Sequence, residues 1–250
     1  MSRKLSFTNS WKAVCALLTL TTAVLAQQSR LASANSYLER GNRELAKGDY
    51  QRAIEDFTLG LAFAPSSADL FYNRGVARVR AGELAEAESD FSHALRLDPN
   101  MAEALADRAY LLYLKGDYDG VLRDTGRALE LNPKLAQAYH NRGLAYENKN
   151  DFQSARAAYD AAIKLKPKVA EIWNSRGVLR YRQQDYAGAL DDQTRAIKLN
   201  PRLANAWMGR GLARLRLGQR AAAERDFAEC LRIDPKTRPA LEQLLRQLQD

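Results

Sequence analysis

Apolar residues recur along the chain at the spacing of an amphipathic helix, and that pattern is itself repeated. From Ala136 to about Lys149, apolar side chains stand three or four residues apart, which predicts a first helix. A short polar turn follows, and a second apolar run of the same spacing continues to Pro167, which cannot extend a helix. The segment 136–169 therefore predicts a helical hairpin.

The same hairpin pattern returns every 34 residues. Counted from Ala34, the repeats cover most of the chain, and each one ends at a loop that carries a proline. A fixed period of this length indicates a solenoid, in which each hairpin buries its apolar face against the next. The six units are 34–67, 68–101, 102–135, 136–169, 170–203 and 204–237.

Small residues mark one position in each half of the unit. The first, which we call the glycine position, holds Gly41, Gly75, Ala109, Gly143, Gly177 and Gly211. The second, the alanine position, holds Ala53, Ala87, Val121, Ala155, Ala189 and Ala223. Because only small side chains allow two helices to approach closely, we expect the two helices of a hairpin to meet at these positions.

Aromatic residues and a closing proline complete the pattern. In the sixth unit the marked residues are Trp207, Arg210, Gly211, Arg214, Ala223, Phe227 and Pro235. This order resembles the tetratricopeptide repeat. The resemblance implies an all-α fold, a right-handed α-solenoid of six helical hairpins followed by a C-terminal capping helix.

The residue before the glycine position departs from that family pattern, which has leucine there. In this chain it is arginine in every unit, as in the Asn-Arg-Gly style of repeat found in many bacterial members of the family. We call this the arginine position, and its residues are Arg40, Arg74, Arg108, Arg142, Arg176 and Arg210.

An aspartate follows each of these arginines after sixteen residues, except in the fourth unit, which has Ala158. This aspartate position holds Asp56, Asp90, Asp124, Asp192 and Asp226. We expect each arginine to face an aspartate across the two helices of a hairpin, or across adjacent hairpins, with the arginine stem covering apolar surface. The alternative is a ladder of arginines that binds a ligand.

The third unit is the least regular of the six. Ala109 and Val121 need more room at the close contact, and Thr125 replaces the aromatic residue found in four other units. Two glycines in its second helix each lower helix propensity by about 1 kcal/mol relative to alanine. We expect a local weak spot, with a functional hinge as the alternative. The fifth unit has a milder lapse, Gln193 at the aromatic position.

The first 26 residues combine a basic start, a 14-residue apolar run at 13–26 and small residues at the end of that run. These are the parts of a secretory signal peptide. An uncleaved membrane anchor is the alternative, although a span needs about 20 apolar residues. Residues 27–35 form a polar lead-in that we expect to be loose, with the first repeat helix beginning near Asn35 or Ser36.

The other end of the chain, 238–250, predicts a capping helix from Ala240 to Gln249. It has a single stripe of leucines, at Leu241, Leu244, Leu245 and Leu248, as a terminal capping element requires. Cys15 would leave with the signal, so Cys230 would stand alone in the mature chain, without an internal disulfide. We interpret Cys230 as a small buried residue.

Charge is unevenly distributed. The formal net charge is +8, of which +3 lies in residues 1–26, zero in residues 27–169 and +5 in residues 170–250. The basic last third can attract an acidic protein segment, an anionic lipid or a cell-wall polymer, or it can serve as a solvated surface. Its charge density is too low for a nucleic-acid footprint, so no nucleic-acid partner is expected.

Nothing in the sequence supports catalysis. His93 and His140 occupy different positions of their units, and there is no cluster of metal ligands, nucleophile motif or phosphate-binding loop. We therefore expect a protein that is not an enzyme and that uses no cofactor or metal.

The family resemblance places the binding surface on the concave groove, which the first helices line. Carried over position by position, that groove also includes Leu38 and Asn42. Its predicted partner-binding residues are Tyr72, Asn73, Val76, Arg80, Tyr110, Tyr113, His140, Asn141, Leu144, Asn174, Val178, Tyr181, Arg182, Met208, Leu212 and Arg216. The polar and cationic clamp that some relatives use to hold a chaperone's C-terminal carboxylate is absent, since Leu38 and Glu103 occupy two of its positions.

We expect an exported protein-interaction scaffold, periplasmic or secreted, that holds a protein or peptide segment in this groove. The apolar row Tyr72, Val76, Tyr110, Leu144, Val178 and Leu212 is expected to bind the segment, and Asn73, Asn141 and Asn174 to bond its polar groups. The alternative is that neighbouring helices cover these side chains. A second functional alternative is an accessory subunit that binds an anionic envelope polymer or lipid through residues 170–250.

The signal-peptide interpretation predicts removal of residues 1–26. N-terminal sequencing of the mature protein should therefore start at Gln27. A cytoplasmic protein that keeps Met1 or Ser2 at its N-terminus would contradict export.

Overall fold

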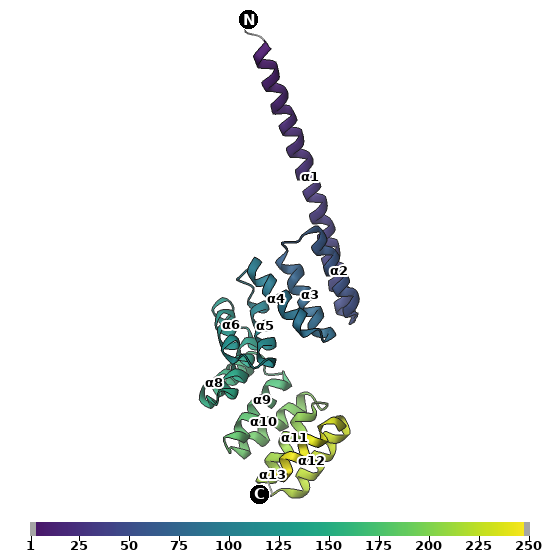
Figure 1. The fold of residues 1–250 in the computed structure, drawn as a ribbon. Coiled ribbons are helices and arrows are strands. Elements are labelled where there is room, and N and C mark those ends of the chain that lie inside the picture. The colour runs from purple at the N-terminus through teal and green to yellow at the C-terminus, as the bar shows by residue number, and fades with distance from the viewer. Residues whose placement is uncertain (1–3, 248–250) are drawn as a thin grey trace. The chain divides into compact units, whose positions relative to one another are not determined.

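The structure is a computed structural model that describes the backbone of residues 4–247 and the side chains of Thr22 and residues 24–246. Over residues 4–247 it has thirteen α-helices and one short 3-10 helix, η1, at Pro235–Thr237 (Figure 1). The α-helices are α1 Lys4–Lys47, α2 Tyr50–Phe63, α3 Ala68–Ala81, α4 Leu84–Leu97, α5 Ala102–Leu114, α6 Tyr118–Leu131, α7 Ala136–Asn148, α8 Phe152–Leu165, α9 Ala170–Arg182, α10 Tyr186–Leu199, α11 Ala204–Arg216, α12 Arg220–Ile233 and α13 Arg238–Gln247.

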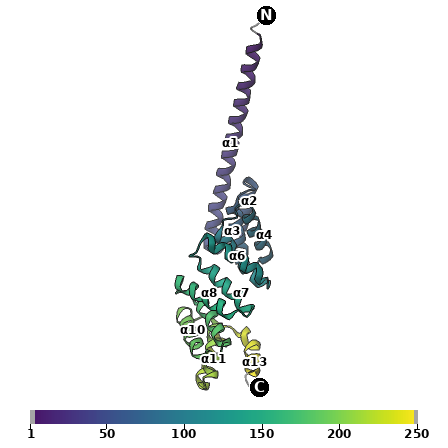
Figure 2. The same ribbon diagram turned by 90° about the vertical axis from the view of Figure 1, so that its left-hand side faces the viewer.

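The chain forms two compact units, Met1–Ala104 and Leu105–Asp250, and the boundary falls inside α5. In the first unit, α1 packs on α2, α2 on α3, and α3 on α4. In the second, α6 to α12 pack in chain order, each helix against the next, as both ribbon views show (Figures 1 and 2). Each unit is therefore a stack of antiparallel helical hairpins, and the expected all-α solenoid architecture is confirmed.

The segment 27–35 is helical, so the expectation of a loose lead-in was wrong. α1 runs without interruption from Lys4 to Lys47 and contains both the polar lead-in and the first repeat helix (Figure 1). No glycine or proline interrupts the chain before Gly41, and residues such as Ala, Leu, Gln and Arg favour helix. Within the described residues, no helix is both long enough and apolar enough to cross a membrane.

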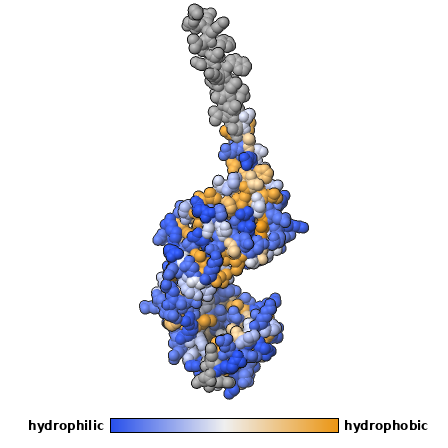
Figure 3. All heavy atoms as spheres, viewed as in Figure 1, coloured by the Kyte–Doolittle hydropathy of each residue, from blue (hydrophilic) through white to orange (hydrophobic). Residues whose placement is uncertain are grey.

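Apolar side chains remain exposed where α1 meets the loop between α2 and α3 (Figure 3). They belong to Val24, Leu25, Leu31 and Phe63. Leu31 and Phe63, together with neighbouring residues of 26–31 and 63–67, line an open cavity of about 750 Å³. This end of the first unit has no repeat stacked on it among the described residues.

The glycine position is small because an aromatic ring lies against it. A Cβ atom on Gly143 would stand 2.5 Å from a ring carbon of Tyr159, and one on Gly75 would stand 2.7 Å from Phe91. The same contact recurs at Gly41 with Phe57. The close contact that we predicted between the glycine and alanine positions is thus filled by the ring that lies one turn beyond the alanine.

The third repeat keeps this fit with different residues. Ala109 replaces glycine, and the ring opposite is replaced by the smaller Thr125, whose hydroxyl donates to the Val121 carbonyl at 2.7 Å. All three side chains are fully buried. The larger residues at the glycine and alanine positions are therefore balanced by a smaller residue at the ring position.

The turn inside every hairpin has a residue with positive φ. These residues are Gly48, Gly82, Gly116, Asn150, Gln184 and Gly218, with φ between 61° and 86°. Glycine adopts this conformation at low cost and asparagine more readily than most residues. In four turns the next residue is an aspartate whose carboxylate accepts a backbone N–H from the first turn of the following helix: Asp49, Asp117, Asp151 and Asp185.

The predicted arginine–aspartate pairs are present in all five repeats that have both residues. Each arginine binds the aspartate with two parallel hydrogen bonds across the two helices of its own hairpin, and the Nε–Oδ2 distances lie between 2.7 and 3.0 Å. The aspartates are buried, at 2 to 8% exposure. Because the guanidinium groups point into the hairpins, the framework interpretation is confirmed and the ligand ladder is not.

A second arginine on the same helix joins three of these pairs, which the sequence analysis did not anticipate. Arg78 Nη1 binds Asp90 Oδ2 at 2.7 Å, Arg180 Nη1 binds Asp192 Oδ2 at 3.2 Å, and Arg214 Nη1 binds Asp226 Oδ2 at 2.8 Å. Two guanidinium groups thus share one buried carboxylate in the second, fifth and sixth repeats.

The last helix, α13, packs its leucines against the sixth repeat, as predicted for a cap. Leu241 is buried with Ala223 and Phe227, and Leu244 and Leu245 pack beside it. Leu248 lies outside the described residues. The helix starts at Arg238, two residues before the predicted start, so Pro239 lies in its first turn, where proline is tolerated.

Arg142 in the fourth repeat has no aspartate opposite it, and its Nε is buried without a hydrogen-bond partner. Its guanidinium lies 5.0 Å from the Tyr139 ring centroid. Ala158→Asp supplies the carboxylate that the other repeats have, so we expect the free energy of unfolding to stay within about 1 kcal/mol of wild type. The matched control, Ala162→Asp, buries an unpaired charge one turn away and should cost at least about 3 kcal/mol. Urea unfolding measures both, and equal losses would contradict the pairing.

Candidate functional site

The predicted groove residues of the first unit lie on α3. Tyr72 is half-buried beside Phe91, with ring centroids 5.9 Å apart. The amide of Asn73 donates to the Asp69 carbonyl of its own helix at 2.8 Å. Val76 is half-buried and Arg80 is exposed. This face therefore offers one aromatic edge and one cation, with little continuous apolar surface.

The predicted groove residues of the second unit lie on α5, α7, α9 and α11 and differ widely in exposure. Tyr110 and Val178 are exposed at 39% and 38%, the largest values in the predicted apolar row. Tyr113, Leu144, Tyr181 and Met208 are partly buried between helices. Within the predicted apolar row, exposure is thus concentrated at two positions, and Leu114 at the end of α5 is a further exposed apolar residue outside that row.

Two predicted contact residues are structural, and we correct their assignment. Asn141 is 2% exposed, and its amide donates to the Ala106 carbonyl of the preceding repeat at 2.8 Å, so it joins α7 to α5 and cannot bond a partner. Leu212 is 8% exposed and packs with Tyr181 and Met208 in a core cluster. For Leu212, the alternative that neighbouring helices cover the row is correct.

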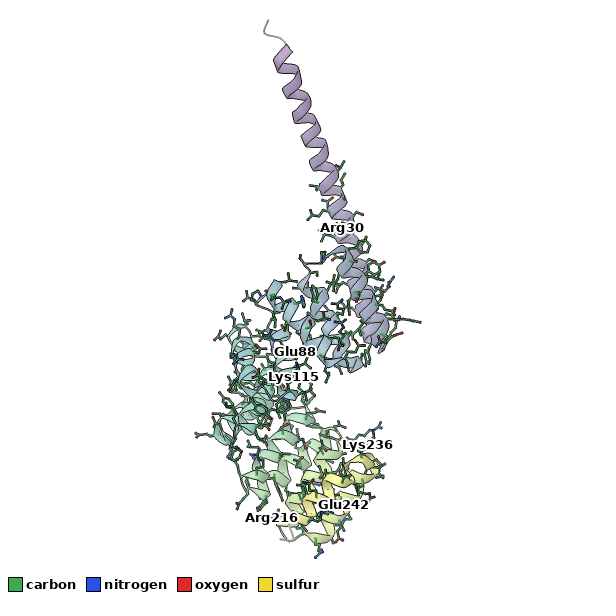
Figure 4. The ribbon with its side chains drawn as sticks, viewed as in Figure 1. Arg30, Glu88, Lys115, Arg216, Lys236 and Glu242 are labelled. Carbon is green, nitrogen blue, oxygen red and sulfur yellow. The ribbon has the colours of Figure 1, made fainter. Side chains whose placement is uncertain are left out.

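Arg182 and Arg216, predicted as groove cations, contact their own unit. Arg182 Nη1 lies 3.2 Å from Glu147 Oε1, and Arg182 Nη2 donates to Asn150 at 3.0 Å, so Arg182 links the fourth and fifth repeats. Glu147 is buried and also accepts the Tyr159 hydroxyl at 2.8 Å. Burial, with the charge of Glu147, raises the pKa of Tyr159. Arg216 lies over the Tyr186 ring at 4.9 Å, near the turn edge of the sixth repeat (Figure 4).

Asn174 and Gln193 form a buried polar contact in the fifth repeat. The Gln193 amide donates to the Asn174 backbone carbonyl at 3.2 Å, while Gln193 Oε1 and Asn174 Oδ1 are buried without partners. Gly177 and Gly209 flank this amide, and a Cβ on either would stand within 2.8 Å of Gln193 Nε2. Gln193 therefore takes the space of the ring used in other repeats, and polar atoms lie beneath this part of the surface.

His140 lies in a half-buried position at the start of the fourth repeat. Its Nε2 is 2.9 Å from Ser175 Oγ, and the Ser175 hydroxyl donates to the Glu171 carbonyl at 3.0 Å. Since the hydroxyl hydrogen is used there, Nε2 must carry the proton and donate to Ser175, which leaves Nδ1 as an acceptor. Burial lowers the pKa of His140 to about 4, so the ring is neutral at physiological pH.

A cavity of about 460 Å³ opens beside His140 at the loop edge of the second unit. Its lining comes from the loop before α7, the first turns of α7, the loop before α9 and Ile172. The sequence predicted that His140 lies in the groove, but it did not predict this cavity. The cavity is lined by residues of two loops that are one repeat apart in the chain. Among the described residues, no group of three or more His, Cys, Asp or Glu side chains is placed to hold a metal ion.

Comparison with known proteins supports the architecture. The family model described as Tetratricopeptide repeat matches residues 31–102, 78–136, 140–201 and 181–236. No curated protein matches the sequence.

Solved structures resemble the chain at the level of fold. PilF of Pseudomonas aeruginosa is 19% identical with a TM-score of 0.73, over 89% of this chain and all of that one. A tetratricopeptide repeat protein from Parabacteroides merdae is 20% identical with a TM-score of 0.67, over 98% of this chain and 95% of that one. YrrB, described as a tetratricopeptide repeat protein with an unusual peptide-binding site, is 22% identical with a TM-score of 0.56, over 74% of this chain and 94% of that one.

The low pKa of His140 predicts acid sensitivity. Between pH 6.5 and 4 the unfolded chain binds a proton at His140 that the folded chain does not, so this residue makes stability fall as pH drops through that window. His140→Gln removes this contribution, which amounts to at most about 3 kcal/mol. Urea midpoints at pH 7 and pH 4 should therefore differ less in the variant than in wild type. Equal pH dependence would show that His140 is not held neutral.

Proposed function

Because the chain belongs to the tetratricopeptide repeat family, we propose that it is a non-enzymatic scaffold that binds a segment of a partner protein on the first helices of its second unit. Tetratricopeptide repeat folds serve protein–protein interaction. The proposal for this chain rests on a single observation: Tyr110 and Val178 are exposed large apolar side chains on the first helices α5 and α9.

The framework of the hairpins leaves these side chains free. The glycine position and the residue opposite it face the inside of the hairpin, as does the arginine–aspartate pair in the five repeats that have one. Tyr110 lies one residue after its glycine position, as does Val178, and neither is part of a buried core cluster. Large apolar side chains that a fold does not need inside are typical of an interaction surface.

Val178 has a polar neighbour on its own helix. Asn174 lies one turn before it and is partly exposed, although its side-chain oxygen is buried and therefore not open to a partner. Tyrosine adds contact area at a low entropy cost, since it has only two side-chain torsions. The peptide-binding site ascribed to YrrB supports the same kind of ligand, by analogy of fold.

We further propose that the protein acts in the cell envelope, after export directed by residues 1–26. The support is the order of a basic start, an apolar run and small residues in the sequence. If residues 1–26 remained as a membrane anchor, the repeats would still lie on the outer side of that membrane, as they would after cleavage.

A second candidate is an accessory subunit that binds an anionic polymer or lipid through residues 170–250. The net charge of +5 in this third favours it. Binding of this kind should weaken steeply with salt, whereas apolar contact at Tyr110 and Val178 should not.

Photo-crosslinking in cells tests the scaffold proposal. A photoreactive amino acid at position 110 or 178 should capture the same protein, while one at the exposed Leu217 should not capture it. For the purified partner, Tyr110→Ala should cost about 2 kcal/mol of binding, about thirtyfold in Kd, with the melting temperature unchanged. Leu217→Ala serves as the matched control for removal of an exposed apolar side chain. Loss of binding only in Arg216→Ala, together with strong salt dependence, would favour the polymer or lipid candidate instead.

A further inference from the structure

The cavity beside His140 combines apolar lining with positive charge. Leu135, Ala136, Val169 and Ile172 supply its apolar surface, and Gln137 and His140 supply polar groups. Lys134 and Lys166 stand at its rim, one from each of the two loops that border it. The cavity lies within the second unit, beside the face that the first helices form.

The uncharged polar side chains that line the cavity are already held by hydrogen bonds. His140 donates to Ser175, and Gln137 donates to Asp107 Oδ1 at 2.6 Å, which leaves the histidine Nδ1 and the glutamine Oε1 as acceptors. Ile172 is nearly fully buried and belongs to a core cluster with Ala162. The floor is therefore built from packed and hydrogen-bonded side chains.

The two rim lysines carry unpaired charge. Neither Lys134 nor Lys166 lies in an ion pair with a described residue, and both are exposed. The loop before α7 is held in shape by Asn132, whose Oδ1 accepts the Lys134 backbone N–H at 3.1 Å. The loop before α9 is closed by the Val169 N–H, which donates to the Lys166 carbonyl at 3.3 Å. The lysines are thus presented by ordered backbone.

The same edge carries a cation in each repeat of the second unit. The residue after the loop proline is basic four times in succession, at Lys134, Lys168, Arg202 and Lys236, whereas the equivalent residues of the first two repeats are Ser66 and Asn100. The Asn132 contact recurs at Asn200 with Arg202 and at Asp234 with Lys236. Figure 4 shows Lys236 on the side of the sixth repeat away from Arg216.

We propose that this cavity binds an acidic segment of a partner protein, with one aliphatic side chain in the apolar hollow and flanking carboxylates on Lys134 and Lys166. Further carboxylates of the segment pair with Lys168 and Arg202 along the edge. This deepens the proposed scaffold function and rests on it, because it gives the chemistry of the segment that the second unit binds.

The apolar lining favours a protein segment over a lipid surface or a sugar or phosphate polymer. A polyanion without apolar groups would contact the lysines and leave Leu135, Val169 and the hollow between them wet. A membrane surface is broad, whereas a cavity of about 460 Å³ accepts one or two side chains. An acidic residue next to a leucine, isoleucine or valine satisfies both parts of the site.

Three short fluorescent peptides of equal length test the proposal on the full chain by anisotropy. The first has one leucine flanked by glutamates, the second has serine in place of that leucine, and the third has lysines in place of the glutamates. We expect the first to bind, the second to bind about tenfold more weakly and the third not to bind. Val169→Ser, which removes an exposed apolar wall residue, should weaken only the first peptide.

Charge reversal identifies the site. Lys134→Glu with Lys166→Glu should raise the Kd of the first peptide by about tenfold or more. Lys164→Glu with Lys198→Glu makes the same change of charge at exposed residues outside the cavity and should change the Kd by less than about threefold. Circular dichroism melting of both double variants shows whether they remain folded.

Several results would overturn the proposal. These are equal weakening by both double variants, equal binding of the leucine and serine peptides, or no binding of the first peptide. Binding to phosphatidylglycerol vesicles that the Lys134 and Lys166 variant abolishes would assign the edge to lipid instead. If crosslinks at positions 110 and 178 persist in that variant with unchanged partner affinity, this cavity is not the site while the scaffold function stands. If those crosslinks are absent in wild type, the scaffold function itself fails.

Discussion

The contact between a glycine on the first helix and a ring on the second sets the geometry of each hairpin. The ring lies so close to the glycine Cα that a single added carbon would overlap it in the first, second, fourth and sixth repeats. The third repeat obeys the same limit by pairing Ala109 with Thr125, and the fifth by pairing Gly177 with Gln193. In the third repeat a larger residue at the glycine position is therefore accompanied by a smaller residue opposite it. A close-packed interior permits such paired exchanges more readily than single ones.

The buried arginine–aspartate pairs hold part of the positive charge inside the hairpins, where a partner cannot reach it. Five arginines at the arginine position, and three more on the same helices, are used inside hairpins. The charges left for binding are the exposed ones, which include Lys134 and Lys166 on loops. The net charge of a segment is thus a poor guide to its binding surface, because four arginines of residues 170–250 (Arg176, Arg180, Arg210 and Arg214) are held inside hairpins.

The repeat period, the hairpin and the arginine–aspartate pairing were predictable because each depends on a spacing within one unit. Sixteen residues separate Arg74 from Asp90, and the same interval recurs wherever both residues occur. Features that join two adjacent repeats were not predictable in this way. The Asn141 amide donates to the Ala106 carbonyl of the preceding repeat, and the cavity beside His140 forms between two loops one repeat apart. The continuity of α1 does not follow from composition, because polar residues occur both in loops and on exposed helices, and nothing in 27–35 breaks a helix.

The most direct test of this packing constraint is a double-mutant cycle on Gly75 and Phe91, measured by urea unfolding. Gly75→Ala alone should cost about 1–3 kcal/mol, because its Cβ would stand 2.7 Å from the ring. In the Phe91→Thr background, which reproduces the pair found in the third repeat, the same change should cost nothing or stabilise the helix by up to about 1 kcal/mol. An equal cost of Gly75→Ala in both backgrounds would show that the ring does not set the glycine position.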